Sequence, residues 1–131
     1  DLSESTILLP RSEIADPNLP EQLRKLGASV EVVPAYQTVI PKHSKTDIRK
    51  VFENPMDVII FASSSSVSNL MTLLKDNMSY MEGSLIACIG PATAATARGL
   101  GLSVDVTAQS HTIEGLVDDL ELFFLNGNAK S

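Results

Sequence analysis

The sequence has few of the residues that mark disulfide-bonded and metal-binding proteins. It contains one cysteine, Cys88, so no internal disulfide can form. Cys88 lies in the apolar run of residues 85–89, which indicates a small core residue and not a reactive thiol. The two histidines, His43 and His111, have no Cys or His at ligand spacing. We therefore expect no metal site.

Long apolar runs are also missing. No run approaches the roughly 18 residues that a membrane span requires. Residues 1–5 are acidic and polar, whereas a secretory signal would show a basic stretch followed by an apolar one. We expect a soluble protein with no membrane partner, located in the cytoplasm or in an organelle with any transit segment already absent.

Basic residues are too few for a nucleic-acid partner. Ten Lys and Arg stand against 16 Asp and Glu, for a formal net charge of −6. Phosphate binding needs a basic face, so this balance argues against DNA or RNA. An acidic small molecule would have to rely on backbone amides and helix N-termini more than on Lys and Arg.

What the sequence does contain is an alternation of short β-rich runs and helical stretches, within the usual size of one domain. Strands are expected near residues 6–9, 30–36, 57–61, 85–89 and 104–107. Pro10 should stop the first strand, and Pro34 suggests an edge position or a bend in the second. Gly27 should end the first helix. The repetition predicts an α/β fold, with a parallel sheet, helices on both faces and right-handed crossovers.

Three of the expected strands run directly into polar helix starts, at residues 63–66, 90–93 and 110–112. The carboxyl ends of parallel strands meet at the edge of the sheet where ligands bind, so these turns should line one cleft. The candidate binding residues are Ser63, Ser64, Ser65, Gly90, Pro91, Thr93 and Thr112. Each turn taken alone also fits simple helix capping. No Walker loop, dinucleotide fingerprint or nucleophilic triad is present, although His111 in the third turn could touch a ligand.

Four segments carry a more specific pattern. They are Val-Pro-Ala-Tyr-Gln-Thr at 33–38, Phe-Ala-Ser-Ser-Ser-Ser-Val at 61–67, Ile-Gly-Pro-Ala-Thr-Ala at 89–94, and Gly-Leu-Ser-Val-Asp-Val at 101–106 followed by Thr-Ile-Glu-Gly-Leu at 112–116. In this order they resemble segments of the uroporphyrinogen-III synthase family. Ala62, Ser64 and Ala92 depart from its usual Thr, Pro and Thr, which removes some hydroxyl groups but leaves main-chain contacts.

The resemblance implies a bilobed protein whose lobes are each flavodoxin-like, of which this chain is the C-terminal half. Residues 1–38 would form a strand-helix-strand unit of one lobe, and 39–44 the linker between lobes. Residues 45–126 would build β-α units of the other lobe, and 127–131 a polar tail. Expressed alone, such a chain could close into one domain or exchange its first strands with a second copy as a swapped dimer.

The resemblance also implies an activity without metal or coenzyme. The family converts hydroxymethylbilane, a linear tetrapyrrole, into uroporphyrinogen III, with loss of water and inversion of the last pyrrole ring through a spiro intermediate. It suggests Tyr36 as the group that assists hydroxyl departure, because a phenol is protonated at neutral pH and can donate. The residues alone leave two alternatives open, a non-catalytic flavodoxin-like domain that binds a small anion and a purely structural α/β interaction domain.

Overall fold

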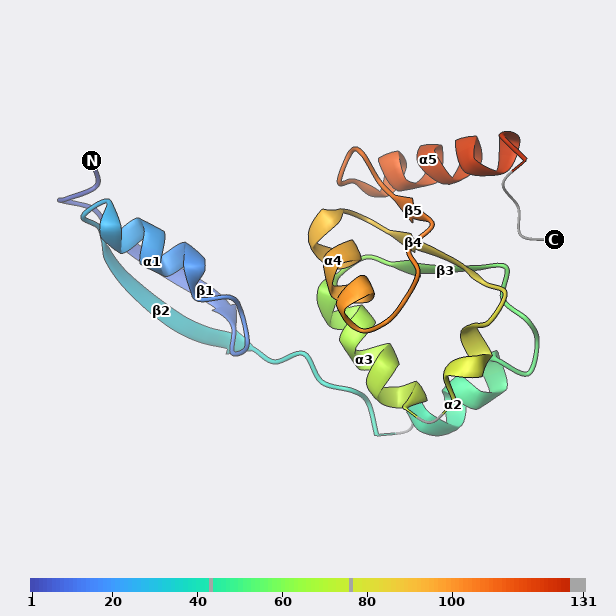
Figure 1. The fold of residues 1–131 in the computed structure, drawn as a ribbon. Coiled ribbons are helices and arrows are strands. Elements are labelled where there is room, and N and C mark those ends of the chain that lie inside the picture. Colours follow the sequence, from blue (N-terminus) through green and yellow to red (C-terminus); the bar gives the residue numbers. More distant parts are fainter. Residues whose placement is uncertain (43, 76, 128–131) are drawn as a thin grey trace. The chain divides into compact units, whose positions relative to one another are not determined.

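The chain folds as two compact units. The computed structural model describes residues 1–42, 44–75 and 77–127, and the units span Asp1–Val39 and Ile40–Ser131 (Figure 1). His43 and residues 128–131 of the expected polar tail lie outside the described residues. All the strand pairs are parallel, as predicted, but the strands form a two-stranded and a three-stranded sheet, one in each unit.

The first unit is a β-α-β element. Strand β1 (Thr6–Ser12) pairs in parallel with β2 (Ser29–Tyr36), and helix α1 (Asn18–Lys25) connects them. The predicted helix stop is confirmed, because Gly27 follows α1 with a φ of 96°, a left-handed conformation that favours glycine. Helix α1 lies against one face of the strand pair (Figure 1).

The expectation that Pro10 ends the first strand is wrong. Strand β1 continues through Pro10 to Ser12, and Pro10 lies opposite Val33. In a two-stranded sheet both strands are edges, so a residue without an N–H group can turn its nitrogen toward the open side. Pro34 occupies the same kind of edge position in β2, as its place in the sequence suggested.

The second unit contains the longer β-α array. Its elements, in chain order, are α2 (Ser44–Val51), β3 (Val58–Phe61), α3 (Ser64–Leu74), the 3-10 helix η1 (Met78–Met81), β4 (Leu85–Cys88), α4 (Pro91–Gly99), β5 (Val106–Thr107) and α5 (Ile113–Leu125). The strand order is β3-β4-β5, with every pairing parallel. The central strand β4 is buried at all four positions, which explains its unbroken apolar sequence.

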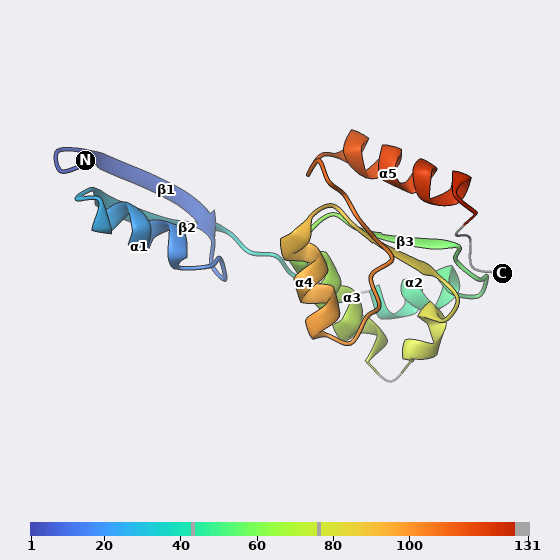
Figure 2. The same cartoon turned by 45° about the horizontal axis from the view of Figure 1, so that its top comes forward.

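Helices cover both faces of this sheet, as predicted (Figure 2). Successive residues of a strand point to opposite faces. Ile86 and Cys88 of β4 therefore join the core formed with α3 and α4, whereas Ala87 joins a second core with Leu116 of α5. The sheet thus separates two apolar clusters.

Strand β5 is shorter than the expected 104–107, and Asp105 provides the reason. Its carboxylate Oδ2 accepts a hydrogen bond from the amide of Ile86 at 2.8 Å. The amide of Asp105 donates in turn to the carbonyl of Ile86 at 2.9 Å. A side chain takes the place of a main-chain carbonyl here, so regular pairing begins only at Val106.

Helices α3 and α4 pack closely against each other on one face of the sheet (Figures 1 and 2). The contact uses small side chains from α4, because Ala94 and Ala97 are completely buried in the same cluster as Val67 of α3. Methyl-sized side chains allow two helix axes to approach closely. The two helices begin at neighbouring strand ends, so this packing fixes the distance between their N-termini.

Candidate functional site

The three predicted turns lie at one edge of the second unit's sheet. The strand ladder continues to that edge, where the amide of Ile89 donates to the carbonyl of Phe61 at 3.0 Å and the amide of Ala108 donates to the carbonyl of Cys88 at 2.9 Å. The hydroxyl of Ser64 donates to the carbonyl of Ala92 at 3.4 Å and links the first turn to the second. We call this edge, formed by residues 63–66, 90–93 and 110–112, the rim.

The first turn of the rim is held by its serines. Ser63 is the N-cap of α3, and its Oγ accepts a hydrogen bond from the amide of Ser66 at 3.1 Å. The hydroxyl of Ser66 donates back to the carbonyl of Ser63 at 2.6 Å. The hydroxyls of Ser63 and Ser65 lie 3.1 Å apart. Capping is therefore one real role of this serine run, and the first amides of α3 have no acceptor within the helix.

The second turn lacks a side-chain cap. Gly90 is the N-cap of α4 in extended conformation, and Pro91 occupies the first turn, where its missing N–H costs nothing. Thr93 is only 5% exposed as a residue, so its side chain and most of its main chain are covered in this structure. Pro91 and Ala92 are exposed.

The third turn is also capped. The hydroxyl of Thr112 accepts from the amide of Gly115 at 3.0 Å at the start of α5. Gly115 is required by space, because a Cβ at this position would lie 2.5 Å from the carbonyl oxygen of Ser110. The first turn of α5 carries Glu114, whereas the first turns of α3 and α4 contain no acidic residue.

The rim can therefore bind anions chiefly at α3 and α4. A helix N-terminus presents unpaired amides and the positive end of the helix dipole, and two such ends lie side by side here. Glu114 opposes a negative ligand at the start of α5. Such an arrangement could accept an anion through main-chain amides without Lys or Arg, which is what the net charge of −6 requires of any acidic ligand site in this chain.

Sequence reasoning missed one contact at the rim. The ring of exposed His111 lies against Gly90, such that a Cβ at Gly90 would be 3.2 Å from both Cγ and Cδ2 of the imidazole. The contact joins the second turn to the third. The sequence offered little to indicate this contact. Its one feature here is a glycine followed by a proline at a helix start, and that pair is also common where no imidazole ring lies against the glycine.

Tyr36 belongs to the other unit. It is the last residue of β2, its side chain is 61% exposed, and its carbonyl accepts from the amide of Glu13 at 3.2 Å. The pairing shifts register between Arg11 and Ser12, which brings Ser12 opposite Tyr36. The phenol is accessible at the end of its strand.

The lone thiol is a core group, as its sequence context indicated. Cys88 is completely buried, and this burial raises its pKa, while the charge of Arg98 acts in the opposite direction. Across the described residues, no three His, Cys, Asp or Glu side chains are grouped so that they could hold a metal ion. No described helix is long and apolar enough to cross a membrane.

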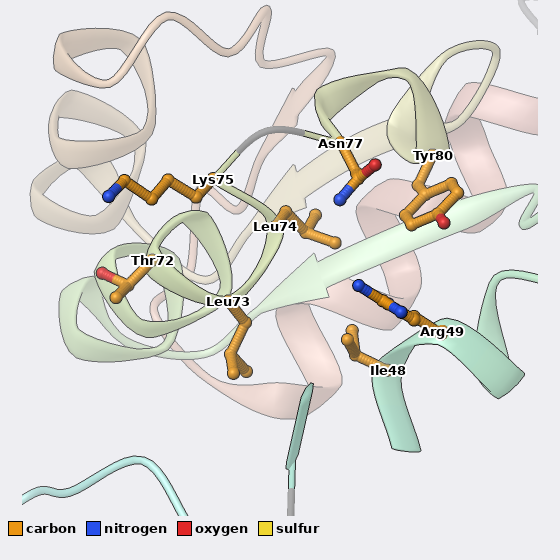
Figure 3. Close-up of a pocket in the computed structure, with 8 residues that line it drawn as sticks. All are labelled: Ile48, Arg49, Thr72, Leu73, Leu74, Lys75, Asn77 and Tyr80. Carbon is orange, nitrogen blue, oxygen red and sulfur yellow. The ribbon is translucent and has the colours of Figure 1, made fainter. Parts of the chain in front are cut away.

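A pocket of about 140 Å³ lies away from the rim (Figure 3). It is formed by α2, the C-terminal end of α3 and η1, with Ile48, Leu74 and Tyr80 among its lining residues. Because α3 starts at the rim and runs back across the sheet, its C-terminal end lies at the opposite edge. The pocket and the rim are separate features.

Comparison with known proteins identifies the family. The family model described as uroporphyrinogen-III synthase HemD matches residues 1–118. The chain belongs to the uroporphyrinogen-III synthase family. Uroporphyrinogen-III synthase from Synechococcus elongatus is 32% identical over 122 residues, which cover 88% of this chain and 46% of that protein. The crystal structure of uroporphyrinogen-III synthetase from Helicobacter pylori superposes with a TM-score of 0.70 at 16% identity, covering 94% of this chain and 55% of that one.

These relatives are longer than the chain. It spans about half the length of the Synechococcus protein and of the Helicobacter structure. The structural similarity, at 16% identity, concerns the fold, and it covers the α/β units described above. The resemblance first indicated by the four sequence segments is confirmed.

Proposed function

We propose that this chain is the C-terminal half of a uroporphyrinogen-III synthase, and that its rim forms one side of the active-site cleft. In this proposal the two units belong to different lobes, joined by a linker at residues 39–44. The complete enzyme cyclises hydroxymethylbilane to uroporphyrinogen III, with inversion of the last pyrrole ring and loss of water, in tetrapyrrole biosynthesis. Membership of the family over residues 1–118 carries the proposal.

The geometry of the rim supports a tetrapyrrole substrate. The substrate bears many carboxylates, and the adjacent N-termini of α3 and α4 offer unpaired amides with no acidic residue in either first turn. The binding group would comprise Ser63, Ser64, Ser65, Gly90, Pro91, Thr93 and Thr112. Thr93 would contribute little accessible surface, because the residue is only 5% exposed.

The chain's residues supply position more than reactive groups in this mechanism. Pyrrole carbons are nucleophilic without activation, so holding the two ends of the chain near each other provides much of the acceleration. Tyr36 would donate a hydrogen bond or proton to the departing hydroxyl, and its 61% exposed side chain is free to face a substrate. The carbocation left at the terminal methylene is then attacked by the last pyrrole to form the spiro intermediate.

The test supplies freshly generated hydroxymethylbilane to the full-length protein that contains this chain. After oxidation, the porphyrin isomers are separated by chromatography. An excess of isomer III over the type I isomer, which arises by spontaneous closure, supports the proposal. Isomer I alone at all protein concentrations contradicts the enzymatic reading. Detectable binding of a tetrapyrrole without turnover would then favour an anion-binding domain over a purely structural one.

The open sheet edges suggest how the isolated chain would behave. Strand β3 is an edge strand with Ile60 52% exposed, and Leu8 of β1 is 65% exposed. Uncovered apolar edges promote association, so the chain alone should form dimers by strand exchange. Light scattering after size exclusion would give the mass, and a monomer at high concentration contradicts the exchange. We also propose a cytoplasmic location, which cell fractionation would test.

A further inference from the structure

We propose that His111 is a substrate-contacting residue of the rim, donating a hydrogen bond from its imidazole to a carboxylate of the bound tetrapyrrole. This inference rests on the proposed function and adds to it a side chain that the family motifs do not contain. It gives the third turn a side-chain donor for an anion. The N-terminus of α5 is less suited to bind an anion, because Glu114 in its first turn repels a negative charge.

The position of the ring carries the proposal. His111 is exposed and directly precedes Thr112, the N-cap of α5. Its Cγ and Cδ2 are the atoms that an added Cβ on Gly90 would meet first, both at 3.2 Å, and Nε2 follows at 3.6 Å. The Cγ–Cδ2 edge therefore faces the Gly90 backbone, and the two ring nitrogens lie farther from it than these two carbons.

The ring is held by packing and not by hydrogen bonds. Within the described part of the chain, neither ring nitrogen has a hydrogen bond or a carboxylate within ion-pair distance. An imidazole fixed in place with its nitrogens unused can donate to a ligand without first breaking a protein contact. Fixing the ring in advance also reduces the entropy cost of binding.

The choice of ligand follows from the surroundings. The ring stands at the start of α4, where Gly90 provides no side-chain cap and Pro91 provides no N–H. A carboxylate accepting from the remaining amides of that turn would come within reach of the ring. A ring N–H at this point adds a side-chain donor to the main-chain amides that the acidic chain offers a carboxylate.

Four single variants of the full-length protein, and the double variant that combines Gly90→Ala with His111→Ala, test the role of the ring. His111→Ala removes the donor, and His111→Asn restores an N–H near the place of Nδ1. Gly90→Ala moves the ring slightly without straining the chain. The backbone at Gly90 is extended and accepts alanine, but the new Cβ must displace the His111 ring by a few tenths of an ångström. Glu82→Ala, exposed on the opposite edge of the sheet, controls for general effects of surface substitution.

Two readouts separate this inference from the proposed function. The first is KM and kcat with hydroxymethylbilane, and the second is the Kd of uroporphyrin III, a stable porphyrin with eight carboxylates, measured by fluorescence. His111→Ala should raise KM and Kd about tenfold with little change in kcat, as expected for one charge-assisted hydrogen bond, and His111→Asn should recover most of the loss. Gly90→Ala should weaken binding in the native background and much less in the His111→Ala background.

The outcomes are distinct. Absence of turnover with binding that still depends on His111 would sink the enzymatic function and leave the contact standing. Native KM and Kd in His111→Ala would overturn the contact while turnover persists. An Asn variant as impaired as the Ala variant, equal Gly90→Ala effects in both backgrounds, or a protein that neither binds nor converts a tetrapyrrole would also overturn it.

Discussion

Ser63 allows capping and substrate binding to be separated by two substitutions at one position. Its Oγ accepts from the amide of Ser66 at 3.1 Å, and this bond stabilises the start of α3. Ser63→Ala removes the acceptor and should lower the free energy of unfolding by about 1 kcal/mol. Ser63→Asp keeps an acceptor in the same place and adds a negative charge that the helix dipole favours, so the stability should remain close to native.

For substrate binding the larger effect should come from the other variant, Ser63→Asp. A new carboxylate about 6 Å from a substrate carboxylate, at an effective dielectric constant of about 40, repels it by about 1.4 kcal/mol, which is about tenfold in KM. Ser63→Asp should therefore raise KM about tenfold without loss of stability. Ser63→Ala should lose stability with a smaller change in KM.

The assay pairs urea unfolding, followed by circular dichroism, with turnover of hydroxymethylbilane by the full-length protein. Asn126→Asp is the matched control, because it adds the same charge at the end of α5, which lies at the edge of the sheet opposite the rim. A rise in KM equal to that of Ser63→Asp would show a global charge effect. If Ser63→Asp binds substrate as tightly as the native protein, the rim does not hold its carboxylates.

Three further predictions concern single positions. Tyr36→Phe should cut turnover by about tenfold or more, and an unchanged rate of isomer III formation, corrected for isomer I, would remove Tyr36 from the mechanism. Gly115→Ala should destabilise the protein by about 1–3 kcal/mol, because its Cβ would lie 2.5 Å from the Ser110 carbonyl oxygen; native urea unfolding would contradict this. Burial raises the pKa of Cys88 in the folded state, so its contribution to the free energy of unfolding should be complete below the ordinary thiol pKa and be lost as the pH rises from there through the raised pKa. Cys88→Ala should lose this decrease of stability at alkaline pH. The same decrease in both proteins would show that Cys88 is not its cause.

The element types were predictable because local patterns and burial agree. Thr112 supplies a cap and apolar residues follow it at helical spacing, a local pattern that predicts a helix and matches α5 (Ile113–Leu125). The continuous apolar run at residues 85–89 correctly indicated β4, because a strand covered on both faces has no polar side. Each of these patterns is local, because the residues that form it lie within the element itself or next to its end.

What could not be predicted depends on partners distant in sequence. The truncation of β5 arises from the Asp105 carboxylate bonding to Ile86, 19 residues earlier. The short helix η1 carries no periodic pattern of its own. Pro10 remains in a strand only because its sheet has two strands, both at edges.

The candidate site divides in the same way. Strand-to-helix turns with Ser, Gly and Thr were visible in the sequence, and their gathering at one edge follows from parallel topology. The inward direction of Thr93 and the seating of His111 on Gly90 required coordinates, because each depends on how α4 packs. The assignment of Tyr36 and the seven rim residues to substrate stays a prediction.

The alanine packing of α4 also bears on how the sequence can vary. Ala94 and Ala97 are fully buried against the core, whereas Ala92 and Ala95 are exposed on the same helix. A larger residue at either buried position would push α4 away from α3, and the two helix starts that form the rim would separate with them. Related sequences should therefore vary freely at Ala95, which lies outside the rim, while the buried pair keeps its size, because a larger side chain there would disturb the rim without touching any ligand.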